Sequence, residues 1–328
     1  MDEGVSSIKT ILFDMDGVIT SELAYWKSSA LTVYEYFHND YELNSDHCYE
    51  EVDQIMARVF SENKTIEVAK SLSVNSNWDL TYITILAAEI LKCENTYSTA
   101  DVDIFSKIPD FLIEKNASAP ELFDILSDEY EEIFNLENCS RESEFYKKIQ
   151  AAFQKWYLGG LIEHEIPLLS LEKTVNLISY LHGKGYVLGI GTGRPLEEIT
   201  RPLKNWGIIK YFDSDRIISY NDVIDDQKIY NENKEEKIRL AKPHPYTFIK
   251  GFIGKERFLP SDLDRKMPHN PSVLVVGDAV CDFESAREAG FRFCAVLTGI
   301  DGRESENYFI NEGADFVIDD ASNLKEIL

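Results

Sequence analysis

Short apolar runs that end in glycine or in polar residues predict the strands of a parallel sheet. Such runs occur at residues 8–13, 186–191, 216–220, 272–276, 291–297 and 314–318. Segments with helical periodicity lie between several of the later runs, at about residues 171–181, 195–206 and 243–251. Because strands alternating with helices are typical of βαβ units, we predict an α/β fold with a doubly wound parallel sheet.

The pattern changes between about residues 22 and 165, where apolar positions recur at helical spacing and no run resembles a strand. The expected helices cover about residues 23–37, 52–60, 80–91, 120–136 and 145–158. We therefore predict one α/β domain, formed by residues 1–21 and 166–328, with an all-helical domain inserted at 22–165. The polar stretch 221–236 is expected to form a surface loop or an irregular helix. The role of segments 221–240 and 254–271 is left open.

Composition narrows the possible partners. The chain has 328 residues and a net charge of −25, which disfavours nucleic acid and anionic membrane surfaces as partners. Five cysteines without C-x-x-C spacing indicate neither a disulfide framework nor a zinc site. The N-terminus lacks an apolar targeting segment, so we expect a cytoplasmic protein. The oligomeric state is not predicted.

The first apolar run ends in the sequence DMDG, which delivers Asp14 and Asp16 to the carboxyl end of a buried strand. Two carboxylates this close cannot both ionise cheaply unless a cation lies between them or one keeps its proton. With a metal, Asp14 would be a nucleophile for phosphorus. Asp16 would then be a general acid and base.

Three later motifs stand at comparable positions. Thr192, in GIGTGRP, could bind an anionic oxygen, although an ordinary threonine cap explains it equally well. Lys242, in AKPHP, could neutralise a phosphate or be a solvated surface lysine. In VLVVGDAVCD, Asp278 is placed to complete a site for a hard cation such as Mg²⁺. Asp282 could belong to that site or cap a helix.

In this order, DMDGV, Thr192, Lys242 and GDAVCD resemble the motifs of the haloacid dehalogenase superfamily of phosphotransferases. The resemblance covers residues 1–20 and 166–328. It implies that Asp14 is the nucleophile and a Mg²⁺ ligand. It also implies that Asp16 is the general acid and base, with its backbone carbonyl on the metal.

The same resemblance implies roles for the remaining residues. Thr192 and the amide of Gly193 would hold the phosphoryl oxygens, and Lys242 would orient and neutralise them. Asp278 would bind Mg²⁺, and Asp282 would support the metal directly or through water. The helical insertion resembles the cap domain that many members carry, and it is long for that cap type.

The expected function is a Mg²⁺-dependent phosphatase that hydrolyses a small phosphorylated metabolite through an aspartyl-phosphate. The DMDGVIT opening also resembles β-phosphoglucomutase, so a phosphosugar mutase is an alternative. Dehalogenase activity is disfavoured because that branch lacks the second aspartate, which Asp16 supplies here. A non-catalytic binding protein on the same fold is a further alternative, although Asp14, Asp16, Lys242 and Asp278 are all present.

Overall fold

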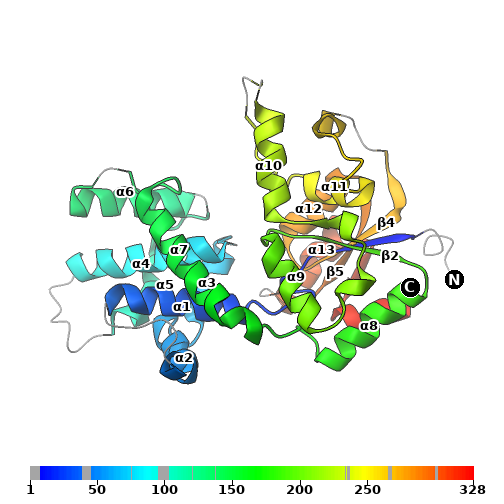
Figure 1. The fold of residues 1–328 in the computed structure, drawn as a ribbon. Coiled ribbons are helices and arrows are strands. Elements are labelled where there is room, and N and C mark those ends of the chain that lie inside the picture. The colour runs from blue at the N-terminus through cyan, green and yellow to red at the C-terminus, as the bar shows by residue number, and fades with distance from the viewer. Residues whose placement is uncertain are drawn as a thin grey trace. The chain divides into compact units, whose positions relative to one another are not determined.

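The fold is seen in a computed structural model of the chain (Figure 1). It describes residues 8–38, 46–74, 76–94, 103–119, 121–136, 138–232, 234, 237–264, 268–299 and 302–328. The chain divides into two compact units. The first unit runs up to Glu22 and resumes at Glu165, and the second is Leu23–His164. In the described part of the chain, no helix is both long and apolar enough to cross a membrane.

A six-stranded sheet forms the centre of the first unit, and every neighbouring pair of strands is parallel. The strand order is β3-β2-β1-β4-β5-β6. The strands are β1 Thr10–Phe13, β2 Val187–Gly191, β3 Ile217–Ile218, β4 Asn270–Gly277, β5 Phe291–Val296 and β6 Phe316–Ile318. The predicted doubly wound parallel sheet is therefore confirmed.

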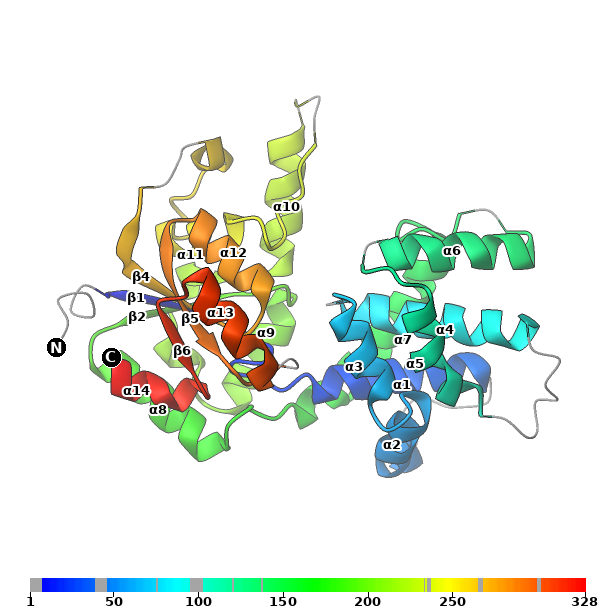
Figure 2. The same cartoon turned by 180° about the vertical axis from the view of Figure 1, so that it is seen from behind.

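Helices cover both faces of this sheet because residues along β1 alternate between two apolar clusters. Ile11 and Phe13 belong to one cluster, together with residues of α8 and α9, and Leu12 belongs to the other, with residues of α11, α12 and α13. Figure 2 shows α12 and α13 beside β5 and β6. The helices are α8 Leu171–Gly183, α9 Leu196–Asn205, α10 Tyr220–Asn231, α11 Tyr246–Ile253, α12 Val280–Glu288, α13 Glu306–Glu312 and α14 Leu324–Ile327.

The order of the strands reverses at β1. From β1 the chain order runs outward to β2 and β3 on one side, and to β4, β5 and β6 on the other. Phe13 is in register with Ile190 of β2 and with Val276 of β4. In open α/β sheets, ligands bind outside the carboxyl ends of the strands at such a reversal. The residues that follow β1, β2 and β4 therefore lie where a ligand would bind.

In its described residues, the second unit is built from helices, as the helical periodicity predicts. They are α1 Leu23–Phe37, α2 Asp46–Val59, α3 Lys64–Ser71, α4 Asn77–Glu94, α5 Ile108–Glu114, α6 Glu121–Phe134 and α7 Glu144–Gly159. Its core is rich in aromatic side chains, with Tyr82 stacked on Phe123 at 5.2 Å and edge-on to Tyr146 at 5.1 Å between ring centroids. Such pairs stabilise a core beyond their burial alone.

Two local expectations were wrong. The helices α3 and α5 lie in segments for which no helix is predicted. Within the polar stretch 221–236, residues up to Asn231 form the regular helix α10 instead of a loop or an irregular helix, and residues 233, 235 and 236 lie outside the described part of the chain. The start of this helix is fixed by a capping box, in which Ser219 and Asp222 satisfy each other's backbone N–H groups. Val223 is its buried apolar contact, which explains why its hydrophobic signal is weak.

Candidate active site

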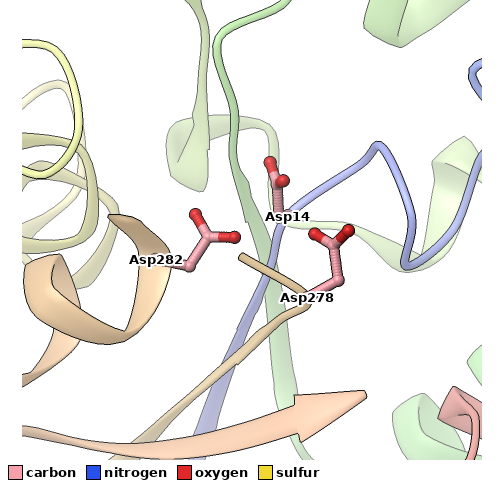
Figure 3. A group of neighbouring side chains, drawn as sticks. All are labelled: Asp14, Asp278 and Asp282. Atoms are coloured by element: carbon pink, nitrogen blue, oxygen red, sulfur yellow. The ribbon is translucent and has the colours of Figure 1, made fainter. Parts of the chain in front are cut away.

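Three aspartates converge at the reversal of the sheet. Asp14 directly follows β1, Asp278 directly follows β4, and Asp282 lies in the first turn of α12. Each offers a carboxylate oxygen, and these three oxygens lie within 4.8 Å of one another. Figure 3 shows the three side chains approaching from these separate segments. The structure thus brings together the three carboxylates that the sequence analysis assigned to a metal.

Glycines make room for these carboxylates. A Cβ atom added to Gly17 would lie 2.1 Å from Oδ2 of Asp278, and one added to Gly299 would lie 2.2 Å from the same oxygen. Gly17 also has a φ of +70°, which L side chains rarely adopt. A Cβ added to Gly277 would meet the side chain of Asp282 at 2.6 Å. At these three positions the backbone lies so close to the side chains of Asp278 and Asp282 that only glycine fits.

Lys242 is the cationic partner of this group. Its Nζ lies 2.9 Å from Oδ1 of Asp14 and 2.6 Å from Oδ1 of Asp282. Its side chain is only 12% exposed, so the reading as a solvated surface lysine is excluded. Lys242 lies ahead of α11, on the segment that enters this edge of the sheet. One ammonium therefore ties the nucleophile candidate to the aspartate of α12.

Burial dominates the electrostatics of the group. Burial raises the pKa of Asp14 from 3.8 to about 7, although the Lys242 ammonium acts to lower it, and Asp282 and Asp16 raise it further. The pKa of Asp278 is also raised well above its ordinary value, first by burial and then by Asp282 and Asp14. Burial alone would lower the pKa of Lys242, but Asp14 and Asp282 raise it above 10.5. If all three carboxyl groups were ionised, the single positive charge of Lys242 would not balance their negative charge.

A divalent cation fits this arrangement. Oδ2 of Asp282 is buried and has no hydrogen-bond partner among the described residues. The donors are carboxylate oxygens, which hard cations such as Mg²⁺ prefer. An added positive charge would offset both causes of the raised pKa values of Asp14 and Asp278, which are burial and then repulsion by the neighbouring carboxylates. The residues present therefore suit the predicted metal.

Thr192 directly follows β2 at the same edge of the sheet, and it is buried. Its backbone N–H donates to the Ile218 carbonyl at 3.1 Å, and its hydroxyl accepts a hydrogen bond from the Arg194 N–H at 3.4 Å. Gly193 is exposed, and a Cβ added there would meet no atom within 4 Å. Open space next to Gly193 leaves room for a phosphoryl group.

The Asp16 carboxylate lies outside the group of three carboxylates and is bound by Arg194 instead. The Nε of Arg194 donates to both carboxylate oxygens at 3.1 Å, and Nη2 donates to Oδ1. The Thr20 hydroxyl donates to the same oxygen at 3.3 Å. Arg194 is not among the site residues predicted from the sequence. The available signal was an arginine two residues after Thr192, in the loop that follows a buried strand.

The carboxylates and Lys242 thus form a centre at the strand-order reversal of a parallel α/β sheet, where such sheets bind ligands. A profile of haloacid dehalogenase-like hydrolases matches residues 8–290. The chain belongs to this family. Comparison with curated proteins found no match.

Solved structures resemble the chain over nearly its whole length. A crystal structure described as a Northeast Structural Genomics Consortium target is 26% identical, with 98% of each chain covered and a TM-score of 0.78. A predicted phosphoglycolate phosphatase from Haemophilus somnus is 16% identical, with 98% of each chain covered and a TM-score of 0.46. A HAD hydrolase of family IA from Entamoeba histolytica is 14% identical, covering 98% of this chain and 97% of that one, with a TM-score of 0.46. The first likeness includes the helical insertion as well as the sheet.

Proposed function

We propose that the protein is a Mg²⁺-dependent phosphatase that hydrolyses a small phosphorylated metabolite through an aspartyl-phosphate on Asp14. The observation that carries this proposal is the convergence of three carboxylates and the Lys242 ammonium at the reversal of the sheet. Phosphoryl transfer requires mainly positioning and charge neutralisation, and this group offers both.

In the proposed reaction, a carboxylate oxygen of Asp14 attacks phosphorus, and the bond to the leaving alcohol oxygen breaks. Asp16 gives a proton to that oxygen. Water then attacks phosphorus, Asp16 takes a proton from the water, and inorganic phosphate leaves as the Asp14 carboxylate is restored. Thr192 and the amide of Gly193 bind phosphoryl oxygens, and Lys242 holds Asp14 and balances charge.

The proposed ligands of the metal are Asp14, the backbone carbonyl of Asp16 and Asp278. Asp282 supports the metal directly or through water, while its Oδ1 stays paired with Lys242. When bound, Mg²⁺ supplies positive charge that neutralises the phosphoryl oxygens and the carboxylates around them.

The helical unit Leu23–His164 is proposed to act as a cap that selects the substrate. The chain leaves the first unit eight residues after Asp14, at Glu22, and returns at Glu165. The net charge of −25 disfavours polyanions, so small monophosphates are the proposed substrates, in preference to nucleic acids or phosphoproteins. A variant with a short Gly-Ser linker in place of 23–164 tests this role. Unchanged selectivity between a metabolite and an aryl phosphate would assign the insertion to assembly instead.

The decisive experiment is a screen of phosphorylated metabolites with Mg²⁺ and with excess chelator. We expect release of inorganic phosphate only with the metal, no turnover by Asp14→Asn, and about a 10²–10⁴-fold loss in Asp16→Asn. Beryllium fluoride should be trapped on Asp14 in a crystal structure. Full activity in chelator, or a wild-type rate in Asp14→Asn, would refute the proposal.

The same screen separates a phosphatase from a phosphosugar mutase. A mutase returns the phosphoryl group to the sugar, so an isomeric sugar phosphate would accumulate in place of inorganic phosphate. Phosphate release and isomer formation are therefore both measured for every sugar phosphate in the screen.

A further inference from the structure

Arg194 is a buried cation outside the group formed by Asp14, Asp278 and Asp282. It is only 2% exposed, and it lies in the loop between β2 and α9. Its guanidinium binds Asp16 through Nε and Nη2, as described above. Its Nη1 lies 3.1 Å from Oε1 of Glu165 and 3.3 Å from the Glu198 carbonyl. The guanidinium thus joins two carboxylates.

The two carboxylates differ in exposure. The side chain of Asp16 is 27% exposed, whereas that of Glu165 is only 1% exposed. A substrate can therefore reach Asp16 but not Glu165 or Arg194. The guanidinium of Arg194 can therefore act on a substrate through the Asp16 carboxylate that it binds.

Glu165 is fixed where the chain re-enters the first unit. Next to it, the Ser21 N–H donates to the Ile166 carbonyl at 3.2 Å, and the Leu168 N–H donates to the Ile19 carbonyl at 2.9 Å. Thr20 also forms an isolated antiparallel bridge with Pro167. Glu165 therefore lies beside a paired segment of backbone and is a firm anchor for Arg194.

Two partners make the position of Arg194 independent of Asp16. A buried arginine is costly unless it is paired, and Glu165 supplies a buried partner whatever Asp16 contacts. The planar guanidinium of arginine can donate several hydrogen bonds to one carboxylate and so hold it in one orientation. The ammonium of a lysine cannot do this. The Asp16 carboxyl can therefore exchange a contact for substrate without displacing the guanidinium.

We propose that Arg194, anchored by Glu165, is a positioning residue that orients the Asp16 carboxyl for proton transfer to the leaving oxygen. The inference rests on the proposed phosphatase function, because only there does Asp16 act as the acid. A positioned acid matters most when the leaving group is a poor one. An alkoxide needs the proton to leave, whereas a nitrophenolate does not.

The test measures first-turnover release of the leaving group from an alkyl phosphate and from nitrophenyl phosphate, in the full-length protein with Mg²⁺. For the alkyl phosphate, we expect Arg194→Gln to lower the first-turnover rate constant by about 10–100-fold, with little change in the substrate concentration that gives half of the maximal rate. For nitrophenyl phosphate, the loss should be several times smaller. Glu165→Gln should also lower both rates, but by smaller factors than Arg194→Gln does. Arg201→Gln, which breaks an ion pair with Glu197 on α9, is the matched control and should leave both rates unchanged.

A double-mutant cycle with Asp16→Asn separates positioning from a structural role. If Arg194 acts through Asp16, Arg194→Gln should cost nothing further in the Asp16→Asn background. Equal losses for both substrates, or full additivity with Asp16→Asn, would overturn the inference. If Arg194→Gln does not fold, Arg194→Lys is measured instead, because it keeps the buried positive charge but lacks the planar guanidinium.

Failure of the proposed function would look different. The wild-type protein and Asp14→Asn are measured first. No metal-dependent turnover in the wild type, or no loss in Asp14→Asn, would refute the phosphatase proposal and this inference with it. Wild-type turnover with leaving-group-independent losses in the Arg194 variants would refute the inference alone.

Discussion

Asp14→Asn should stabilise the metal-free protein, and more so as the pH rises. Burial raises the pKa of Asp14 to about 7, against 3.8 for an ordinary aspartate, even with Lys242 at 2.9 Å. A carboxyl whose pKa is raised on folding stabilises the folded state while it is protonated. That contribution is fully present below pH 3.8 and is lost as the pH rises through 7. Asparagine stays neutral throughout.

The magnitude follows from the size of the shift. One pKa unit corresponds to about 1.4 kcal/mol, so ionised Asp14 costs at most about 4 kcal/mol at pH 8. At pH 5 the same linkage gives about 1.5 kcal/mol, because the pH is only about one unit above the pKa of the unfolded state. The free energy of unfolding of Asp14→Asn relative to wild type should therefore rise by about 2–3 kcal/mol between pH 5 and pH 8.

Urea denaturation in excess chelator at the two pH values measures this difference. Comparing the two pH values removes any effect of the substitution that does not depend on pH, whereas the ionic contact with Lys242 is already included in the pKa of Asp14. Asp319→Asn, at a side chain 64% exposed, is the matched control and should show little change. Mg²⁺ should narrow the gap at pH 8 by binding the folded wild type. A relative stability that is the same at pH 5 and pH 8 would refute the reasoning.

Three further substitutions test the centre. Asp278→Asn should lower Mg²⁺ affinity and turnover together, and calorimetry showing unchanged affinity would contradict its role as a ligand. Gly17→Ala should reduce turnover by at least about 10-fold, because the new Cβ would meet Oδ2 of Asp278 at 2.1 Å. Gly183→Ala, in open space, is its control and should retain the wild-type rate. Lys242→Met leaves Asp282, with a side chain 1% exposed, without its counterion. It should destabilise the metal-free protein by about 3–5 kcal/mol in urea denaturation, and an unchanged midpoint would contradict this.

The sheet was predictable because its strands are short apolar runs that end abruptly. Buried parallel strands are apolar on both faces, so each run is continuous and easily bounded. The carboxyl ends of such strands meet at one edge, which is why Asp14 and Asp278 could be expected near each other. Their approach to within 4.8 Å, and the part that Gly299 plays in it, depend on tertiary packing that no local pattern records.

Two short helices and one ion pair could not be predicted from the sequence. The helices α3 and α5 have eight and seven residues, which is too few for a clear period. The pair formed by Arg194 and Asp16 joins positions 178 residues apart. The arginine in GTGRP could equally be read as part of an ordinary strand-to-helix turn. Only the fold shows that its guanidinium is buried between two carboxylates.

The pairing of Ser21 with Ile166 has a consequence for how such a chain can change over time. The ends of the helical insertion are already joined by backbone hydrogen bonds within the α/β unit. To that unit the insertion is a closed loop, and the entropy of closing a loop grows only slowly with its length. Helices can therefore be added, lost or exchanged between these two positions at little cost to the catalytic sheet. If the insertion selects the substrate as proposed, substrate preference can change while the residues proposed for catalysis stay the same.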